Sequence, residues 1–570
     1  MSSSSISTFS ANTGATVLAA ALRQLQVEVI FGIVGIPVVE VAEACIAEGI
    51  RFIGCRNEQT ASYAAGAYGY LTGKPGVCLV VSGPGVVHAL SGLYNAQANC
   101  WPMILIGGSC ESSQVGRGAF QELDQVAACR PYSKYSGRPL TIEAIPSVLD
   151  QAYRNSVSGR PGPTYVDFPA DLIRGLASNN SSPLSSFKKP NSQAAHDSIQ
   201  RAAEILLSAK RPLIIVGKGV GLAHAEDELA ELVALTGAPF LPSPMAKGMI
   251  SDLHPLCAGA SRSQALQHAD VVLVVGARLN WMFQFGRRFN VNAKLLVADI
   301  EPEEINRNRA AEVALVGDLK STLKQLIQML SLRKKEIINP TPFVNMLADG
   351  SKRNAERTRL QIQQSGSPMN HYMAISTIQD RLNASLPSGD YVLVSEGART
   401  MDVTRVLVPS QLPRRRLDAG TLGAMGVGMG YAIAAQLAYP SKRVVAIFGD
   451  SAFGFSAMDV ETAIRYKLPL IIIVINNGGI YHGLDDLSTL DPSKYPSFAL
   501  SPNTNYELLS KIAPGSTSGY SVRSPAELNT ALEKALRHEA SLSIINVHID
   551  HRPASQGLYW MDSSSTSGKL

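Results

Sequence analysis

The chain has 570 residues, of which 45% are hydrophobic and 17% charged, a composition typical of a folded protein with large cores. Lys and Arg number 51 and Asp and Glu 46, which gives a formal net charge of +5. So small a charge, without a basic block interleaved with aromatic residues, excludes the footprint of a nucleic-acid partner. The apolar runs, such as residues 468–475, fall far short of the roughly 18–20 residues of a membrane span, so we expect none.

Short apolar runs rich in β-branched residues recur along the chain, and many are separated by segments of helical length. Continuous apolar strands that alternate with helices are typical of parallel sheets covered on both faces. The predicted strands are residues 77–81, 103–107, 213–217, 271–276, 295–299, 392–396, 444–450, 470–477 and 544–550. They form three groups and are too many for one compact sheet. We therefore predict an α/β fold of three doubly wound parallel-sheet domains.

Two polar stretches divide the three groups. Residues 176–198 are rich in Ser, Asn and Pro and are typical of a linker. Residues 333–369 are mostly polar, and we expect a mixture of helix and linker there. The predicted domains span residues 12–175, 199–332 and 370–552, and a polar tail covers residues 553–570.

The middle group contains a glycine pattern that imitates a dinucleotide-binding fingerprint. In LIIVGKGVG, Gly217 and Gly219 have the right spacing and Gly221 follows them, but the sixth position is Leu222. The pattern G-x-G-x-x-G is therefore incomplete, and an ordinary NAD or FAD site is not supported.

The third group carries the strongest chemical signal. One predicted strand ends in Gly449-Asp450-Ser451, and the next ends in Asn-Asn-Gly-Gly, with Asn477 placed 27 residues after Asp450. That is the span of a strand–helix–strand crossover, so both residues are expected at the carboxyl ends of neighbouring parallel strands, where open α/β sheets bind ligands. A carboxylate, an amide oxygen and a backbone carbonyl suit Mg²⁺, which completes its shell with phosphate and water. Either half alone would be an ordinary helix cap or turn, but the pair predicts a metal–diphosphate site.

This paired motif resembles the signature of thiamine-diphosphate enzymes. With GDS in place of the common GDG, it is most similar to the branch of 2-hydroxyacyl-CoA lyases and oxalyl-CoA decarboxylases. The similarity covers nearly the whole chain, through IFGIVGIPV (30–38), RNEQTASYAAGAYG (56–69), SGPGVVHAL (82–90), GAFQELDQV (118–126), VGARLNW (275–281), SEGARTMD (395–402), LDAGTLGAMGVGMGYA (417–432), GDSAFGFS (449–456) and NNGGIYHG (476–483). The resemblance implies a carbon–carbon lyase whose first domain binds the pyrimidine of thiamine diphosphate and whose third domain binds its diphosphate with Mg²⁺.

The resemblance also implies the cofactor residues. Asp450, Asn477 and Gly479 match the metal ligands, and Met425 matches the apolar wedge that bends the cofactor. The full set of implied cofactor-binding residues is Glu58, Ala424, Met425, Gly426, Gly449, Asp450, Ser451, Ala452, Asn477, Gly479 and Tyr481.

Glu58 is implied as the residue that activates the cofactor, by a hydrogen bond to a pyrimidine nitrogen. On its own, a Glu in such a loop would be a solvated charge. In relatives this glutamate and the metal site come from different subunits, which implies a homodimer or homotetramer.

The middle domain of this branch resembles a Rossmann-like module that binds ADP, as a structural or activating ligand, or the adenosine end of coenzyme A. Basic side chains suit phosphates, and a carboxylate at a strand end suits ribose hydroxyls. The candidates are Arg160, Lys218, Arg278, Asp299 and Asp318, each of which would otherwise be a surface charge.

Two reactions occur in this branch, and both use an acyl-CoA thioester substrate. One cleaves a 2-hydroxyacyl-CoA into formyl-CoA and an aldehyde one carbon shorter; the other decarboxylates oxalyl-CoA. Phe120-Gln121 stands where the decarboxylases typically carry Tyr-Glu, and Gln121 can hydrogen-bond a substrate hydroxyl without charge. Gln121, Tyr481 and Glu58 are therefore the catalytic candidates, and we expect the lyase reaction.

The C-terminal residues also favour the lyase. Gln556 followed four residues later by Trp560 resembles the lyase ending, which can shield the active site from water. The final Gly568-Lys569-Leu570 is close to the S-K-L address read by the peroxisomal import receptor. The expected location is therefore the peroxisome, and otherwise the cytoplasm.

Two alternatives stay open. Oxalyl-CoA decarboxylase is one, because Arg399 in SEGART stands where relatives usually have Asn and can supply a cation to a second carboxylate. Acetolactate synthase shares the cofactor motifs but would bind FAD in its middle domain, which a flavin spectrum would reveal.

Overall fold

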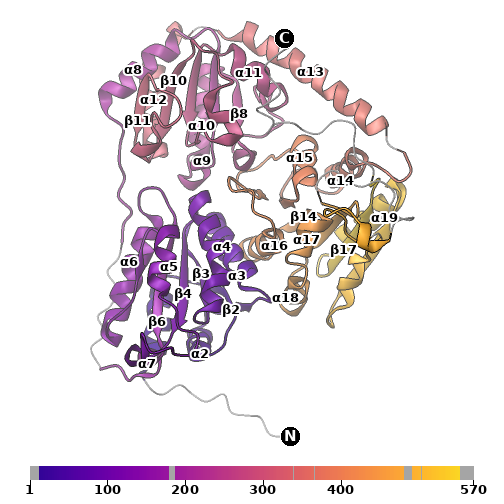
Figure 1. Cartoon of the computed structure of the whole chain (residues 1–570). Coiled ribbons are helices and arrows are strands. Elements are labelled where there is room, and N and C mark those ends of the chain that lie inside the picture. Colours follow the sequence, from indigo (N-terminus) through magenta and orange to yellow (C-terminus); the bar gives the residue numbers. More distant parts are fainter. Residues whose placement is uncertain are drawn as a thin grey trace.

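Three parallel β-sheets, each with helices on its faces, form the molecule (Figure 1). The computed structural model describes residues 12–178, 187–337, 339–364, 366–480, 491–501 and 503–551. Every strand pair in the three sheets is parallel, so the predicted α/β fold class is confirmed.

The first sheet has six strands in the order β2-β1-β3-β4-β6-β5. The strands are β1 (Val29–Gly32), β2 (Arg51–Gly54), β3 (Gly76–Val80), β4 (Met103–Ser109), β5 (Ser136–Gly137) and β6 (Pro163–Pro169). The helices are α1 (Gly14–Gln24), α2 (Val39–Ala47), α3 (Glu58–Thr72), α4 (Pro84–Asn99), α5 (Gln125–Cys129), α6 (Ile145–Val157) and α7 (Ala170–Arg174).

The middle sheet has five strands in the order β11-β10-β9-β7-β8. The strands are β7 (Pro212–Val216), β8 (Phe240–Pro242), β9 (Val271–Val275), β10 (Lys294–Asp299) and β11 (Val313–Val316). The helices are α8 (His196–Leu207), α9 (Gly219–Leu222), α10 (Glu226–Thr236), α11 (Arg262–His268) and α12 (Leu319–Leu332).

The third sheet has six strands in the order β13-β12-β14-β15-β17-β16, which repeats the order of the first sheet. The strands are β12 (Tyr391–Glu396), β13 (Arg416–Asp418), β14 (Arg443–Gly449), β15 (Ile471–Asn476), β16 (Thr517–Val522) and β17 (Leu542–His548). The helices are α14 (His371–Ser385), α15 (Ala398–Leu407), α16 (Gly428–Ala438), α17 (Asp450–Gly454), α18 (Asp459–Arg465) and α19 (Pro525–Arg537).

All nine predicted strands are present within a residue or two, and the second polar stretch combines a helix with non-helical segments, as expected. Its helix is α13 (Thr341–Gln363), of 23 residues. A proline at its start suits a first helical turn, whose N–H groups need no partner inside the helix. Figure 1 shows α13 running beside the middle sheet toward the third part of the chain.

The first and third sheets share one hydrophobic core. Helix α16 lies against α3 so closely that a Cβ at Gly430 would come within 2.7 Å of the Thr60 carbonyl. At the same contact the buried Tyr431 hydroxyl accepts a hydrogen bond from the Asn95 side chain at 2.8 Å, and its ring meets Trp101 edge-on at 5.3 Å. The glycine therefore lets two helices from distant parts of the sequence pack backbone to backbone.

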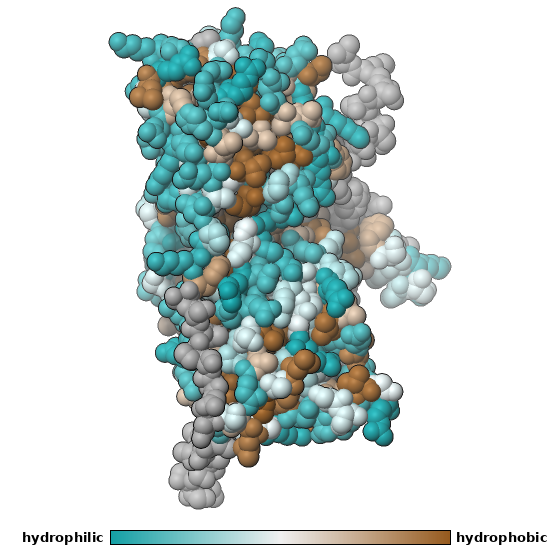
Figure 2. All heavy atoms as spheres, turned by 90° about the vertical axis from the view of Figure 1, so that its left-hand side faces the viewer, coloured by the Kyte–Doolittle hydropathy of each residue, from teal (hydrophilic) through white to brown (hydrophobic). Residues whose placement is uncertain are grey.

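The face over the first and middle sheets is mostly hydrophilic, with some hydrophobic side chains gathered in its upper half (Figure 2). Among the helices that the structure describes, none is both long and apolar enough to cross a membrane.

Candidate active site

Asp450 begins α17 at the carboxyl end of β14, with its side chain only 2% exposed. Its carboxylate accepts hydrogen bonds from the backbone N–H groups of Ser451 and Gly478, both at 2.8 Å. Burial raises the pKa of Asp450 to about 6, although these donors oppose the shift. A carboxylate held in this way, with so little water around it, is suited to a bound cation.

The other two predicted metal ligands lie directly beside Asp450. In the orientation that satisfies its neighbours, the Asn477 amide nitrogen donates to Asp450 Oδ1 at 3.2 Å and to the carbonyl of Gly479 at 2.9 Å. The Asn477 amide thus bridges the Asp450 carboxylate oxygen and the Gly479 carbonyl oxygen, which are two of the candidate ligands of the cation. Rotating the amide by 180° would place its own oxygen beside these two oxygens. The structure therefore brings Asp450, Asn477 and Gly479 together, as the spacing predicted.

This oxygen set fits Mg²⁺ with a diphosphate. Hard oxygen ligands from a carboxylate, an amide and a carbonyl leave positions for phosphate oxygens and water. Gly449 caps α17, Ser451 and Ala452 form its first turn, and the adjacent N–H groups suit the charge of a diphosphate. No group of three or more His, Cys, Asp or Glu capable of holding a metal occurs in the described ranges, so this mixed oxygen set is the metal candidate there.

The glycine-rich loop, residues 420–427, connects β13 to α16 and carries Ala424, Met425 and Gly426. Its end is held by Glu396, whose carboxylate at the end of β12 is 1% exposed. Glu396 accepts from the backbone N–H groups of Gly426, Val427 and Gly428, the last two at 3.2 and 2.7 Å. Burial raises the pKa of Glu396 to about 7, against the effect of these three donors. One buried carboxyl group therefore fixes the loop next to Met425 and the start of α16.

Glu58 is the first residue of α3, and its side chain is mostly buried, at 15% exposed. Asn57 caps the helix by accepting from the Gln59 N–H at 2.7 Å, and Asp459 of α18 accepts from the Arg56 N–H at 2.8 Å. Residues of the third part of the chain therefore help to set the position of the Glu58 turn.

The side-chain partner of Glu58 is His88 on α4, with Nδ1 3.1 Å from Glu58 Oε2. Within the described residues Glu58 makes no hydrogen bond to Asp450, Asn477 or Gly479. In the described residues, the hydrogen bonds of Glu58 and those of the predicted metal ligands form separate clusters.

Gln121 belongs to the Glu58 cluster. Its side-chain oxygen accepts from Ser82 Oγ at 3.2 Å, and Ser82 precedes the helix that carries His88. A Cβ at Gly83 would come within 2.6 Å of the Gln121 carbonyl, so glycine is needed for this close approach. The SGPG turn, residues 82–85, thus connects Gln121 to the helix that contacts Glu58.

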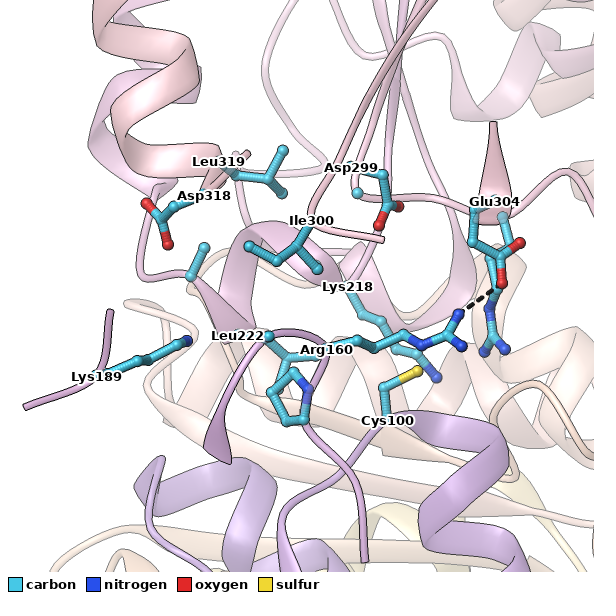
Figure 3. Close-up of a pocket in the computed structure, with 16 residues that line it drawn as sticks. Cys100, Arg160, Lys189, Lys218, Leu222, Asp299, Ile300, Glu304, Asp318 and Leu319 are labelled. Carbon is cyan, nitrogen blue, oxygen red and sulfur yellow. Dashed lines mark hydrogen bonds and ion pairs between the residues drawn. The ribbon is translucent and has the colours of Figure 1, made fainter. Parts of the chain in front are cut away.

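All five predicted nucleotide residues line one pocket (Figure 3). They are Arg160, Lys218, Arg278, Asp299 and Asp318. The same pocket is also lined by Leu222 and by three residues that the sequence did not single out, Lys189, Glu304 and Cys100. Their positions depend on folding, because they come from residues far apart along the chain and carry no motif.

The cavity is electrostatically mixed. Arg160 pairs with Glu304 at 2.7 Å, so part of its charge is compensated. Burial lowers the pKa of Lys218 to about 7, and the charge of Arg278 adds to the shift. Burial raises the pKa of Asp299 to about 6. A ligand with phosphates and hydroxyls would match the cations of Lys218 and Arg278 and the carboxyl group of Asp299 at the end of its strand.

Three family models match the chain, in the order of its three sheets. They are the N-terminal TPP binding domain, the central domain and the C-terminal TPP binding domain of thiamine pyrophosphate enzymes, over residues 12–128, 199–326 and 396–547. The chain belongs to the thiamine pyrophosphate enzyme family. Asp450 and Asn477 lie inside the third match and Glu58 inside the first.

Curated relatives place this thiamine pyrophosphate enzyme within a lyase branch. It is 44% identical over 571 residues to 2-hydroxyacyl-CoA lyase 1 of Mus musculus, with 97% of each chain covered. It is 42% identical to the 2-hydroxyacyl-CoA lyase of Arabidopsis thaliana, over 94% of this chain and 95% of the relative. It is 41% identical to the oxalyl-CoA decarboxylase of Escherichia coli (strain K12), again over 94% and 95%. The two kinds of relative are therefore nearly equally similar.

Arg399 lies on the first turn of α15, which follows β12 at the carboxyl edge of the third sheet. Its Nε is buried and has no hydrogen-bond partner among the described residues. Burial, with a contribution from the Arg399 charge, lowers the pKa of His371 to about 3, so this neighbour is neutral.

Some predicted residues lie outside the part of the chain that the structure describes. They are Tyr481, the tail residues Gln556 and Trp560, and the final Gly568-Lys569-Leu570.

Proposed function

We propose that this thiamine pyrophosphate enzyme cleaves 2-hydroxyacyl-CoA into formyl-CoA and an aldehyde one carbon shorter. The observation that carries the proposal is the 44% identity, over 97% of both chains, to 2-hydroxyacyl-CoA lyase 1 of Mus musculus. The neutral Gln121 beside the SGPG turn supports it, because an amide can pair with a substrate hydroxyl without introducing a charge.

The cofactor is thiamine diphosphate with Mg²⁺. Asp450, Asn477 and the Gly479 carbonyl hold the cation, and the turn that begins α17 receives the diphosphate. Ala424, Met425 and Gly426 contact the cofactor from the glycine-rich loop, which Glu396 keeps in place. When bound, thiamine diphosphate supplies a carbon nucleophile and accepts the electron pair released by carbon–carbon cleavage.

Glu58 holds a proton against the pyrimidine ring. The mostly buried position of its carboxyl group strengthens this hydrogen bond by excluding water. In the single chain Oε2 contacts His88 Nδ1, and that contact orients the carboxyl group before the cofactor is in place. The proposal includes a homodimer or homotetramer in which a cofactor lies between two subunits, as the resemblance to the family implies.

The pocket of the middle domain that these residues line binds the phosphates and ribose of ADP or of coenzyme A in this proposal. Arg160, Lys218 and Arg278 face the phosphates, and Asp299 faces the ribose. Location in the peroxisome, through a receptor that reads Gly568-Lys569-Leu570, remains part of the proposal and rests on sequence alone.

Oxalyl-CoA decarboxylase is the second candidate, and the observation that favours it is Arg399. A buried Nε without a partner among the described residues, beside a neutral His371, offers a cation to the second carboxylate of oxalyl-CoA.

Analysis of the products separates the two candidates. Purified protein with thiamine diphosphate and Mg²⁺ is incubated with a long-chain 2-hydroxyacyl-CoA and, separately, with oxalyl-CoA. The lyase proposal predicts an aldehyde one carbon shorter together with formyl-CoA. If oxalyl-CoA releases carbon dioxide and the 2-hydroxyacyl-CoA gives no aldehyde, the lyase proposal is wrong and the decarboxylase reaction takes its place.

A further inference from the structure

Asp167, on β6, is a fully buried carboxylate that neither the proposed cofactor site nor the nucleotide pocket uses. Its oxygens accept hydrogen bonds from four side chains: Gln125 Nε2 at 2.6 Å, Arg138 Nε at 2.5 Å, and the hydroxyls of Ser109 and Tyr165, both at 2.9 Å. A buried charge is costly unless it is paired and hydrogen-bonded. The four donors therefore hold this carboxylate in one place.

Asp167 fixes the orientation of the Gln125 amide. Gln125 is the first residue of α5 and is fully buried as well. Its NH₂ group donates to Asp167 Oδ1 and, at 2.8 Å, to the Gly108 carbonyl. A carboxylate and a carbonyl are acceptors only, so the amide oxygen must face the other way. There it accepts from the backbone N–H of Gly83 at 2.6 Å.

Gly83 belongs to the SGPG turn, which packs against the backbone of Gln121. Both residues have a φ of 55°, in the left-handed region. For a residue other than glycine this conformation is uncommon, and it persists where the surroundings impose it. The Gln121 carbonyl lies where a Cβ of Gly83 would be, so the turn and the Gln121 backbone are in direct contact. The position of the turn therefore sets the position of Gln121.

Ser82, the first residue of the turn, sets which end of the Gln121 amide is turned away from the turn. Ser82 is buried, and its hydroxyl donates to Gln121 Oε1 at 3.2 Å. The amide oxygen of the half-buried Gln121 thus faces Ser82, and its NH₂ group lies on the opposite side. An NH₂ group is a donor, and the oxygen of a substrate hydroxyl can accept from it.

We propose that Asp167 and Gln125 are positioning residues for recognition of the substrate's 2-hydroxyl group. Through Gly83 and Ser82 they hold Gln121 so that its NH₂ group donates to the oxygen of that hydroxyl. The inference rests on the proposed lyase function, which supplies a 2-hydroxyacyl-CoA as the substrate. Neither Asp167 nor Gln125 touches the substrate; both act through the turn.

This role differs from a role in stability alone, because it acts on one contact with the substrate. Contacts to coenzyme A are common to a 2-hydroxyacyl-CoA and to the acyl-CoA of the same chain length that lacks the hydroxyl. The ratio of the two affinities, which we call the hydroxyl factor, therefore reports the contact with the hydroxyl. A variant that is less stable but still folded keeps the wild-type hydroxyl factor.

The test measures the hydroxyl factor without turnover. The full-length protein is assembled with Mg²⁺ and a thiamine diphosphate analogue whose ring carbon cannot become a nucleophile, and calorimetry gives the dissociation constant of each thioester. Gln125→Met keeps the approximate length of the side chain without its amide. Ser82→Ala is the second variant in case Gln125→Met does not fold, and Gln121→Met removes the proposed contact itself.

Ser109→Ala is the matched control. It removes another buried hydrogen bond to Asp167, but on Oδ2, whereas Gln125 donates to Oδ1. It should lower the unfolding temperature and keep the hydroxyl factor. A loss of the factor in Ser109→Ala as large as in Gln125→Met would make the whole network structural and the positioning role wrong.

We expect wild type to bind the 2-hydroxyacyl-CoA about five- to ten-fold more tightly than the acyl-CoA without the hydroxyl, the effect of one hydrogen bond. Gln121→Met, Gln125→Met and Ser82→Ala should each reduce this factor to about one. Their affinities for the acyl-CoA without the hydroxyl should stay close to that of wild type.

Two further results would overturn the inference. If Gln121→Met keeps the wild-type hydroxyl factor, Gln121 does not bind the hydroxyl. If a folded Gln125→Met or Ser82→Ala keeps it, the contacts through the turn do not position Gln121. In both cases wild type with thiamine diphosphate still forms the aldehyde, so the proposed function stands. If it forms no aldehyde, the proposed function and this inference fall together.

Discussion

The chemistry of the site depends on a few buried polar residues whose neighbours are mostly backbone groups. Asp450 and Glu396 each accept backbone N–H donors and face little water. In both, burial raises the pKa while the donors oppose the shift. Such residues are costly to bury unless they bind something, which makes them sensitive positions for mutation.

Asp450→Ala should abolish tight Mg²⁺-dependent binding of thiamine diphosphate. We expect the dissociation constant to rise more than about 100-fold, because even outer partners of metal ligands are typically worth 10- to 100-fold. Calorimetry with and without Mg²⁺ measures the effect. Glu461→Ala is the control, since that carboxylate on α18 pairs with Arg465 and not with the proposed metal. Wild-type affinity in Asp450→Ala would remove the metal assignment.

Glu58→Gln should bind thiamine diphosphate but activate it slowly, because an amide cannot donate and withdraw a proton as a carboxyl group does. General acid–base roles are worth about 10²–10⁴-fold, and we expect a loss in that range. Exchange of the thiazolium proton of the bound cofactor with deuterium, followed by NMR, reports it. Glu43→Gln, at an exposed position on α2, should exchange at the wild-type rate. A wild-type rate in Glu58→Gln would refute the assignment.

The affinity of ADP for the middle domain should fall as the pH rises above about 7. Lys218 has a pKa lowered to about 7, by burial and by Arg278, with Cys100 and Asp418 opposing, so the empty cavity loses this cation above that pH. The phosphate ligand is fully ionised there, because its second pKa is about 6. Binding should therefore take up protons, which calorimetry in buffers of different ionisation enthalpy detects.

Two variants test whether Lys218, and not another group, causes this pH dependence of ADP binding. Lys218→Met should bind ADP weakly and without proton uptake. Lys189→Met, which removes an exposed cation of the same cavity, should keep the profile. A profile unchanged in Lys218→Met would contradict the assignment.

At the scale of elements, the glycine-rich loop is held at both ends. Thr421 is held by other parts of the chain, and Glu396 binds three consecutive backbone N–H groups at the start of α16. The shape of the loop is therefore imposed by distant residues.

Glu396→Gln should weaken thiamine diphosphate binding and lower the unfolding temperature, because the new NH₂ group faces backbone donors. An unsatisfied buried donor costs about 1–3 kcal/mol. Thermal unfolding and cofactor titration measure both effects. Ser395→Ala is the matched control, since its buried hydroxyl has no hydrogen-bond partner among the described residues. Equal effects in the two variants would argue against a specific role for Glu396.

The strands that the sequence predicted are those with an uninterrupted apolar run. β13 was missed because its three residues are Arg416, Leu417 and Asp418, and the charges are buried through partners elsewhere, such as Arg405 at 2.9 Å from Asp418. β1 and β2 are only four residues long and end in glycine. Short strands whose polar residues find distant partners leave no local pattern to detect.

The residues of the candidate site also fall into a group that the sequence could predict and a group that it could not. Asp450 and Asn477 could be predicted together, because strand–helix–strand spacing brings strand ends to one edge. The pairing of Glu58 with His88, the Glu396 clamp and the contacts of Thr421 could not, since nothing in the spacing of these residues specifies their approach.

At the scale of the whole molecule, the same strand order appears in the first and third sheets, and the middle sheet, read from β8, repeats the first four positions of that order. The predicted metal ligands and Glu396 lie at the carboxyl ends of strands in the third sheet, and Asp299 lies at the carboxyl end of β10 in the middle sheet. Open α/β sheets bind ligands at the carboxyl ends of their strands, and this rule accounts for the position of both candidate sites.

The central claim, cleavage of 2-hydroxyacyl-CoA, is tested most directly by competition between the two thioesters. Coenzyme A contacts are common to both substrates, so the ratio of kcat/KM reports the pocket around the reacting carbons. Wild type and Arg399→Asn are each given a mixture of a long-chain 2-hydroxyacyl-CoA and oxalyl-CoA, and aldehyde and carbon dioxide are measured together. We predict a higher kcat/KM for the 2-hydroxyacyl-CoA in wild type. A preference for oxalyl-CoA in wild type, reversed in Arg399→Asn, would contradict the lyase proposal and assign the decarboxylase reaction to Arg399.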